Sequence, residues 1–338
     1  MRRLRVAQIG AGHDHAADII TTLKMHSDIF ELVGFAVVPE DAENSSAFRF
    51  EAKKEMYSGV TQLSVEDILN MDDLDAVCIE TEDRALTKYA VMAAERGLNI
   101  HMDKPGGTDS GEYDRLIDLV KSRGLVFHVG YMYRYNSAVI KLKKDIAEGK
   151  LGDIISVEAQ MNCLHNAEKR EWLGNYPGGM LYFLGCHMID LIYSIQGEPQ
   201  EVIPLSAVSG LHGTCSEDFG MAAFRYKNGV SFAKSSAVEN GGFERRQLVV
   251  CGTKGTVELR PLEVVDSSCV NTFVPIKTGV REIFDGAPAP YETAPSGRYD
   301  AMMCAFADYI TGKKANPFGY EYERALHRLM LRACGKGI

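Results

Sequence analysis

The sequence predicts an α/β protein with two parts: an N-terminal domain built on a doubly wound parallel sheet, and a C-terminal α+β domain with a large open, mainly antiparallel sheet. Two observations support this prediction. Up to residue 130, short apolar segments alternate with helical segments, which is the pattern of βαβ units. Beyond it, segments alternate apolar and polar residues and are joined by glycine-containing turns, as in hairpins. We therefore expect domains over residues 1–130 and 131–338.

The first domain is expected to contain alternating strands and helices. The strands are predicted at residues 4–9, 32–38, 76–79, 99–102 and 125–129, and the helices at 16–25, 65–70, 86–96 and 113–120. Gly97 and Gly124 follow the last two helices, where glycine commonly ends a helix. Elements in this order and at this spacing form a parallel sheet covered by helices.

The second domain is expected to be richer in hairpins. Strands are predicted at residues 155–161, 221–226, 230–237, 247–251 and 256–259, and helices at 138–148, from the stretch 178–190 to near 197, at 299–310 and at 321–333. Four of the strands flank the turn segments 227–229 and 252–255, which predicts two hairpins. Residues 267–296 are expected to be irregular, and the last two helices to pack on either domain.

Composition excludes several classes of function. The net charge of −9 over 338 residues argues against a nucleic-acid or anionic-membrane partner, and no apolar run is long enough to span a bilayer. The N-terminus leads directly into a strand segment, so we expect a cytoplasmic protein. The eight cysteines are scattered, which indicates reduced thiols, and no group of possible ligands has the spacing of a metal site.

Gly10-Ala11-Gly12 follows the first strand and precedes the first helix. In this context a glycine turn holds a pyrophosphate at the N-terminus of a helix. The third glycine of the dinucleotide fingerprint would fall at position 15, where the chain has His15. Nucleotide binding is favoured over a simple tight turn, because the half match lies in a βαβ unit.

The end of the second strand bears on the choice of cofactor. An NAD site has Asp or Glu there for the ribose hydroxyls, whereas an NADP site has an Arg nearby. The chain has Val37-Val38-Pro39 at this position, and Glu40 only afterwards. We expect NAD or NADP as the cofactor, with NAD slightly preferred.

Lys104 follows the fourth strand, in the segment His-Met-Asp-Lys-Pro-Gly-Gly at 101–107. Ligands of open α/β sheets bind outside the carboxyl ends of the strands, so Lys104 would be delivered to that edge. Near a nicotinamide cation a lysine has a lowered pKa and donates to a hydroxyl or carbonyl oxygen. The alternative is a surface lysine in a turn fixed by Pro105.

The segment Gly-Tyr-Met-Tyr-Arg-Tyr-Asn at 130–136 opens the second domain with aromatic and polar side chains. Such a surface suits sugars or other polyols, although a domain-interface belt has the same composition. Trp172, the only tryptophan, is either a stacking wall for a ligand or part of the core.

His187 lies in the apolar stretch 178–190, which opens with two glycines. In a regular helix Phe183, His187 and Asp190 would share one face. A histidine on such a helix is a candidate acid–base group. The alternative is a core histidine whose ring nitrogens bond backbone atoms.

Together these motifs resemble the Gfo/Idh/MocA oxidoreductase superfamily over nearly the whole chain. The similar elements are the Gly-x-Gly turn, Asp103-Lys104-Pro105 in place of Glu-Lys-Pro, Tyr-Arg-Tyr-Asn at 133–136, Gly-Gly…Gly-x-His-x-x-Asp at 178–190, and Gly-Thr-Lys-Gly at 252–255. The resemblance implies a Rossmann domain and a second, oligomerising domain. It also implies NAD(P)-linked hydride transfer at a hydroxyl or keto group of a sugar, sugar derivative or cyclitol, in a homodimer or homotetramer formed through the C-terminal sheet.

The resemblance further implies roles for individual residues. Lys104 would polarise the substrate oxygen, and His187 would take the hydroxyl proton. The expected cofactor-binding residues are Gly10, Gly12, His13, Val37, Val38, Thr81, Asp103 and Lys104. The expected substrate-binding residues are Tyr133, Arg134, Asn136, Trp172, Phe183 and His187.

Three positions depart from the family pattern. Phe183 stands four residues before His187, where many members have an aspartate, and an apolar ring cannot stabilise an imidazolium. Val37 replaces the acidic residue and His15 the last glycine. These departures fit a divergent branch and leave two alternatives open. One is redox-neutral glycoside cleavage or lyase chemistry with a retained NAD and a keto-sugar intermediate, and the other is a non-catalytic cofactor- or sugar-binding protein.

Overall fold

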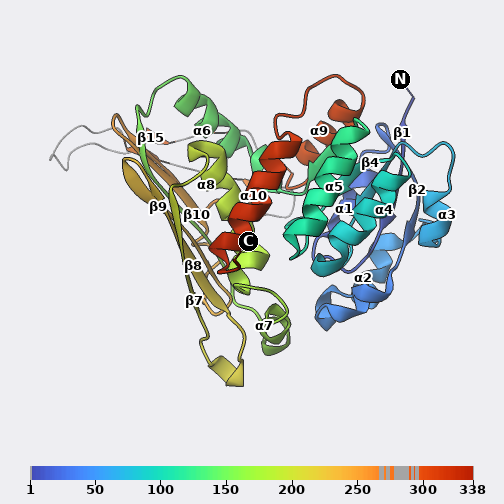
Figure 1. Cartoon of the computed structure of the whole chain (residues 1–338), viewed down its shortest axis with the longest axis horizontal. Helices are drawn as coiled ribbons and strands as arrows, with labels where there is room; N and C mark the ends of the chain where they lie inside the picture. The colour runs from blue at the N-terminus through green and yellow to red at the C-terminus, as the bar shows by residue number, and fades with distance from the viewer. Residues whose placement is uncertain are drawn as a thin grey trace. The chain divides into compact units, whose positions relative to one another are not determined.

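The structure is a computed structural model of the chain, and it describes residues 2–265, 270–271, 275–277, 289–290, 293 and 297–337 (Figure 1). The chain forms two compact units. The first comprises Met1–Tyr131 with Tyr299–His327, and the second comprises Met132–Arg298 with Arg328–Ile338. The return of residues 299–327 to the first unit was left open by the sequence. The functional division at residue 130 stays a prediction.

The first unit contains a five-stranded parallel sheet in the order β2-β1-β3-β4-β5. Its strands are β1 (Leu4–Ile9), β2 (Phe30–Ala36), β3 (Ala76–Ile79), β4 (Asn99–Met102) and β5 (Phe127–Val129). This confirms the predicted parallel sheet. β2 begins and ends two residues earlier than predicted, because Val37 and Val38 leave the strand and lead into a 3₁₀ helix at Pro39–Glu43.

Helices connect these strands and cover the sheet (Figure 1). The connecting helices are α1 (Ala16–Met25), α2 (Phe50–Lys53), α3 (Val65–Leu69), α4 (Leu86–Glu95) and α5 (Ser110–Ser122), and α9 (Asp300–Ile310) and α10 (Tyr320–Ala333) follow late in the chain. The strand order reverses between β1 and β3. Because βαβ crossovers are right-handed, α1 covers one face and α4 with α5 the other, and a ligand crevice is expected at the reversal.

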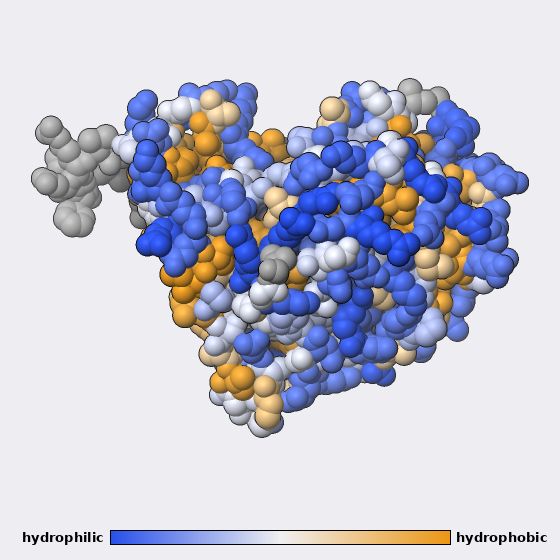
Figure 2. All heavy atoms as spheres, viewed as in Figure 1, coloured by the Kyte–Doolittle hydropathy of each residue, from blue (hydrophilic) through white to orange (hydrophobic). Residues whose placement is uncertain are grey.

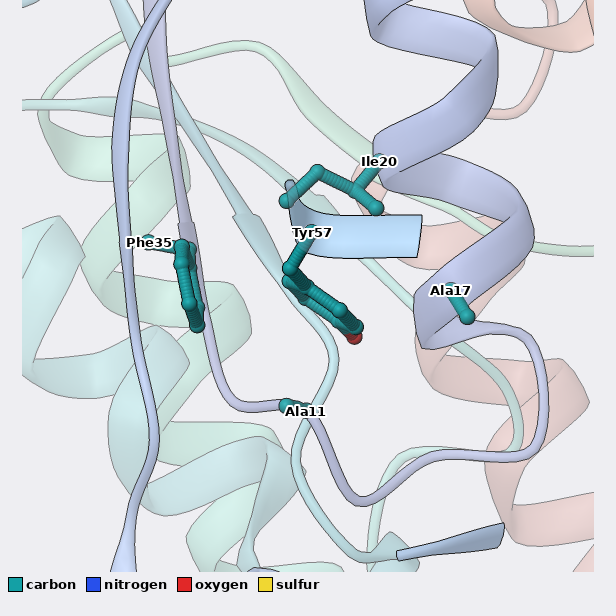
Figure 3. Close-up of a cluster of buried hydrophobic side chains, with 5 residues drawn as sticks. All are labelled: Ala11, Ala17, Ile20, Phe35 and Tyr57. Atoms are coloured by element: carbon teal, nitrogen blue, oxygen red, sulfur yellow. The ribbon is translucent and has the colours of Figure 1, made fainter. Parts of the chain in front are cut away.

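An apolar cluster holds the turn after β1 in place (Figure 3). Its side chains are buried to 3% exposure or less and come from Ala11, Ala17, Ile20, Phe35 and Tyr57. They join the turn to α1, β2 and the 3₁₀ helix at Lys54–Tyr57. Val37 packs against the same cluster, so a valine directly after β2 has a structural reason.

The second unit contains an eight-stranded sheet in the order β15-β14-β11-β10-β6-β9-β8-β7. Its strands are β6 (Ile154–Asn162), β7 (Glu201–Ala207), β8 (Phe219–Tyr226), β9 (Gly229–Ser236), β10 (Gln247–Gly252), β11 (Thr256–Leu259), β14 (Pro275–Lys277) and β15 (Ala289–Pro290). β6 pairs with β9 in parallel, and the other pairs are antiparallel. The predicted hairpins are present as β8–β9 and β10–β11. β7 was not predicted.

Three helices accompany this sheet: α6 (Ser137–Ala147), α7 (Ala167–Leu173) and α8 (Cys186–Gln196). α8 packs against β6 and β9. α7 was not predicted. A separate ribbon pairs β12 (Val264–Val265) with β13 (Val270–Asn271), and most of the segment expected to be irregular, 267–296, lies outside the described residues. Within the part of the chain that the structure describes, no helix has the length and apolar character needed to cross a membrane.

Candidate active site

The turn after β1 requires its glycines because neighbouring backbone crowds it. A Cβ on Gly10 would lie 2.4 Å from the backbone nitrogen of Thr81, and Gly10 has a φ of 95°. A Cβ on Gly12 would lie 2.5 Å from Cα of Asp41. The Gly-x-Gly motif therefore brings the ends of β1, β2 and β3 together at the carboxyl edge of the sheet.

The amides of this turn donate to groups within the protein. The N–H of Ala11 donates to Oδ2 of Asp41 at 2.8 Å. The N–H groups of Gly12 and His13 donate to the carbonyl oxygen of Glu80 at 3.1 and 3.0 Å. A pyrophosphate at this turn would therefore compete with Asp41 and Glu80 for these donors.

Asp41 is a site residue that the sequence analysis missed. The 3₁₀ helix at Pro39–Glu43 folds its carboxylate back onto the turn, where it also accepts the N–H of Val38 at 2.9 Å. Burial raises the pKa of Asp41 to about 7, although the N–H groups of Val38 and Ala11 oppose that rise. A buried carboxylate beside a Gly-x-Gly turn has the chemistry of a ribose-diol acceptor, so the residues fit the ribose end of a dinucleotide.

Glu40, which the sequence placed nearest to the missing acidic position, points elsewhere. Its carboxylate accepts hydrogen bonds from Lys88 Nζ at 2.7 Å and from the hydroxyl of Tyr89 at 3.0 Å. The sequence Pro39-Glu40-Asp41 could have indicated the position of Asp41. A proline often begins a turn, and the third residue of such a turn can fold back to the end of the preceding strand. A cofactor-binding role for Val37, Val38 and Thr81 stays a prediction.

His13, His15 and Asp103 meet at the same edge of the sheet although Asp103 is far away in sequence. Oδ2 of Asp103 lies 3.2 Å from Nδ1 of His13 and 3.1 Å from Nδ1 of His15. All three side chains are buried. The expected cofactor residues His13 and Asp103 therefore contact each other, and His15, the departure from the third glycine, joins them.

Burial and neighbouring charges decide the protonation of this cluster. Burial lowers the pKa of His15 to about 4, against the attraction of Asp103. Burial acts to raise the pKa of Asp103, but His13 and His15 hold it well below its usual range. Burial and the charge of Asp103 raise the pKa of Glu80 well above its usual range. Asp103 therefore favours the ionised form and Glu80 the protonated form.

Lys104 is a buried residue of the same edge, which excludes the alternative of a surface lysine. It directly follows Asp103, and its N–H donates to Oδ1 of that residue at 2.7 Å. Its carbonyl oxygen lies 3.1 Å from Nε2 of His13. The backbone N–H of Lys104 is thus held by Asp103 in its own turn, and its carbonyl oxygen by His13 in the turn after β1.

In the second unit, His187 lies on α8 next to the 3₁₀ turn Met132–Tyr135. Its ring meets that of Tyr133 edge-on, with centroids 5.2 Å apart and an interplanar angle of 89°. The hydroxyl of Tyr133 donates to Glu263 at 2.5 Å, and burial raises the pKa of Tyr133. His187 is therefore buried against one of the expected substrate residues.

Arg134 and Asn136 are also fixed by local contacts. Nε and Nη2 of Arg134 donate to Oδ1 of Asp190 at 3.0 and 2.9 Å, in a buried pair. Asn136 caps α6 by accepting the N–H groups of Ala138 and Val139. The side chains of Arg134 and Asn136 thus have structural partners within the second unit. Their direct contact with a substrate stays a prediction.

The alignment of Phe183 with His187 needs correction. Leu181–Gly185 form a π-helix, so the regular α-helical spacing assumed for Phe183 does not extend through this segment. The ring of Phe183 packs edge-on against Trp172 at 5.3 Å, and Nζ of Lys169 lies 3.5 Å above the Trp172 ring and 4.4 Å from that of Phe183. Trp172 and Phe183 thus form an aromatic contact for a buried lysine.

The parallel sheet, the glycine turn after β1 and the buried lysine after β4 define a Rossmann-fold oxidoreductase. A family model described as "Oxidoreductase family, NAD-binding Rossmann fold" matches residues 4–131, and one described as "GFO/IDH/MocA C-terminal domain" matches residues 139–258. The chain belongs to the Gfo/Idh/MocA oxidoreductase family, as the resemblance predicted.

Relatives and solved structures agree with this assignment. An uncharacterized oxidoreductase of Escherichia coli (strain K12), YhhX, is 33% identical over 160 residues, which are 46% of this chain and 46% of YhhX. Thus the alignment spans about half the length of that relative. The 1,5-anhydro-D-fructose reductase of Ensifer adhaerens is 22% identical over 75% of this chain and 74% of its own.

Two solved structures share the fold at low identity. The aldose-aldose oxidoreductase of Caulobacter crescentus, complexed with glycerol, has a TM-score of 0.79 and 20% identity over 99% of this chain and 98% of its own. The WlbA dehydrogenase of Bordetella pertussis, in complex with NADH and UDP-GlcNAcA, has a TM-score of 0.76 and 19% identity over 100% and 98%. At these identities the likeness shows the fold alone.

Proposed function

We propose that the protein transfers a hydride between NAD(P) and a hydroxyl or keto carbon of a sugar, sugar derivative or cyclitol. The observation that supports this most directly is the buried Lys104, held at the carboxyl edge of the sheet beside the Gly10–Gly12 turn. Family membership and the sugar-related names of several relatives point the same way.

The residues of the chain have separate tasks in this proposal. When bound, the nicotinamide supplies the hydride acceptor or donor. Lys104 orients and polarises the reacting oxygen through its ammonium group. His187 takes or returns the hydroxyl proton at a ring nitrogen, and Tyr133 and the Arg134–Asp190 pair keep its helix in place.

NAD is the cofactor that Asp41 favours. An ionised carboxylate beside the glycine turn accepts ribose hydroxyls, whereas it repels the 2′-phosphate of NADP. Asp41→Asn should therefore weaken NAD binding and narrow the preference for NAD over NADP, as measured by calorimetry. Glu40→Gln is the matched control, because Glu40 pairs with Lys88 instead. An unchanged preference in Asp41→Asn would remove this argument for NAD.

A polyol substrate suits the second unit. A small hollow there is lined by Tyr133, Asn136, Glu263 and Arg298, among others. The hollow itself has room for only about one water molecule, so it is the aromatic, amide and charged character of its lining that favours a ligand with several hydroxyls. A screen of sugars, cyclitols and their keto derivatives with both cofactors would identify the substrate.

The test of the proposal is turnover in two variants with matched controls. Lys104→Met and His187→Gln should each lower turnover by about 10²–10⁴-fold, the usual contribution of a positioned acid–base group. Lys313→Met and His26→Gln remove the same residue types outside the site, where Lys313 is exposed beside Asp308 and His26 pairs with Asp300, and both should retain activity. Full turnover in both active-site variants would contradict the proposed roles.

Cofactor retention separates the alternatives. Nicotinamide absorbance that survives desalting, together with substrate cleavage without net oxidation, would favour the redox-neutral chemistry. Failure to bind either NAD or NADP in calorimetry would contradict both enzymatic proposals and leave a binding protein.

A homodimer or homotetramer through the open sheet is part of the same proposal. Ile203 and Leu205 of β7 and Val230 of β9 are exposed at 44%, 48% and 55%. Figure 2 shows hydrophobic residues, in orange, at the surface where strands of this sheet lie. Light scattering of the wild type and of Leu205→Glu tests this, because a charge in such an interface should dissociate the oligomer.

A further inference from the structure

The cluster of His13, His15 and Asp103 in the first unit has the composition of a metal site. One ligand atom from each residue lies within 4.8 Å of the other two, and all three side chains are buried. Their shortest separations, 3.2 Å from His13 and 3.1 Å from His15 to Asp103 Oδ2, are close to the spacing of about 3.3 Å between ligands of a tetrahedral ion with bonds of about 2.0 Å.

The hydrogen bonds of His13 leave Nδ1 as the atom that could bind an ion. Nε2 lies 3.1 Å from the carbonyl oxygen of Lys104, which can only accept, so Nε2 bears the proton. Nδ1 accepts the N–H of His15 at 3.2 Å and is therefore an acceptor. A ring N–H bound to a backbone carbonyl is also the usual support of a metal-ligating histidine.

Two acceptors consequently face each other in the cluster. Nδ1 of His13 and the carboxylate oxygen of Asp103 lie 3.2 Å apart, and both present lone pairs. This contact is unfavourable unless positive charge lies between or beside the two atoms. Either a proton on His13 or a bound cation would supply it.

Glu80 adds a second carboxylate to the same atoms. Its Oε2 lies 3.9 Å from Nδ1 of His13, and its residue is fully buried. The side chain of Glu80 also forms a hydrogen bond with that of Asp103, so two carboxyl groups share the space beside His13. A second buried carboxyl group beside His13 and Asp103 adds a fourth possible ligand for a cation.

We propose that His13, His15 and Asp103, with Glu80 as a fourth ligand, bind a divalent transition-metal ion such as Zn²⁺. Two imidazoles and carboxylate oxygens are a ligand set that Zn²⁺ prefers in proteins. The ion takes the lone pair of His13 in place of the His15 N–H. It joins the turns after β1, β3 and β4, and so fixes the backbone of Lys104.

The sequence predicted no metal site, because its possible ligands are not closely spaced along the chain. The fold nevertheless brings distant residues together. His13 and Asp103 are separated by 90 positions (103 − 13) in the sequence, yet the carboxyl ends of parallel strands gather their side chains at one edge. The site shares His13 and Asp103 with the expected cofactor-binding residues, but its test measures metal binding alone, so its failure would leave the proposed hydride transfer standing.

The experiment uses the full-length protein, stripped with a chelator, desalted and then titrated with Zn²⁺ in a calorimeter. We expect one Zn²⁺ per chain, confirmed by elemental analysis after dialysis, and a rise in Tm on loading. His15→Phe keeps a planar ring but removes the ligand, and should weaken binding by more than about a hundredfold, the upper range for loss of a supporting partner. His26→Phe, the same substitution outside the cluster, should bind as the wild type does.

Co²⁺ loading of the wild type provides a second measurement that needs no variant. Intense visible bands of tetrahedral Co²⁺ with nitrogen and oxygen ligands are expected. Substoichiometric Zn²⁺ in the wild type, or equal affinity in His15→Phe, would overturn the proposal. An imidazolium at His13, seen by NMR in protein that takes up no Zn²⁺, would overturn it as well and assign the positive charge to a proton.

Discussion

The two units accommodate buried carboxylates in different ways. In the first unit, Asp103 faces two histidines and Asp41 accepts backbone N–H groups. In the second unit, arginines hold two of the buried carboxylates: Arg134 pairs with Asp190, and Arg246 and Arg298 pair with Glu263 at 2.9 Å each. Although burial opposes it, the charges of Arg298 and Arg246 lower the pKa of Glu263.

This difference suggests a structural role for the buried ion pairs of the second unit and a functional role for the buried carboxyl groups of the first. A guanidinium stays charged at every pH at which proteins fold, so the arginine pairs of the second unit fix both charge and geometry. Histidines and buried carboxyl groups can change protonation state, and in their deprotonated forms they can bind cations. The first unit therefore has groups that can change state during binding, and the second unit presents a constant framework.

The largest expected effect is the loss of an arginine pair. Asp190→Asn leaves the buried guanidinium of Arg134 without its carboxylate, which costs about 3–5 kcal/mol in the free energy of unfolding. Urea unfolding followed by circular dichroism measures it. A cost near zero would show that the pair is not part of the scaffold, and would weaken the contrast between the units.

Asp41 should make stability depend on pH. Its folded pKa, about 7, lies above its ordinary value of 3.8, so folding takes up a proton between these values. The stabilisation is complete below about pH 4 and is lost as pH rises through 7, by up to about 4 kcal/mol. Asp41→Asn should lack this loss, so the stability of wild type relative to Asp41→Asn should fall from pH 4.5 to 8 in urea unfolding. A constant difference would show that Asp41 titrates normally.

A substitution of Phe183 tests whether its ring stabilises the contact with Trp172 and Lys169 or influences His187. Phe183→Leu removes contacts with Trp172 and Lys169 and should cost about 1–2 kcal/mol, less than the 3–5 kcal/mol typical of Phe→Ala. Because the ring packs on α7, the pH profile of turnover should be unchanged. A shifted profile would show that Phe183 tunes His187 after all.

The smallest effect is expected for an exposed ion pair. Arg225 and Glu201 pair across β7 and β8 with side chains exposed at 60% and 43%. Glu201→Gln should change the free energy of unfolding by less than about 1 kcal/mol, since solvent screens such pairs. The same urea measurement applies, and a cost equal to that of Asp190→Asn would remove the role assigned to burial.

Most of the fold followed from local patterns. The strands at 4–9, 76–79 and 99–102 and the helix at 16–25 appear at their predicted bounds. The predictions that failed concern elements that depend on distant partners. The sequences of α7 and β7 have no periodicity strong enough to predict a helix or a strand, and residues 181–185 form a π-helix within a stretch that resembles a regular α-helix.

The candidate site was only partly accessible to the sequence. Gly10, Gly12, Lys104 and His187 stand in recognisable motifs, and the structure places the first three at one edge of the first unit. Asp41 was missed because a 3₁₀ turn returns it to the glycines, and Glu80 because no motif marks it.

The sequence alone determined the alternation of strands and helices in the first unit, the glycine turn and the lysine after β4, because periodicity and turn chemistry act over a few residues. Only the tertiary structure decided that His13, His15, Glu80 and Asp103 share one buried edge and that Arg134 holds Asp190. Those contacts join residues far apart along the chain, and burial sets their charges. No local pattern contains either the proximity or the loss of solvent that gives such groups their chemistry.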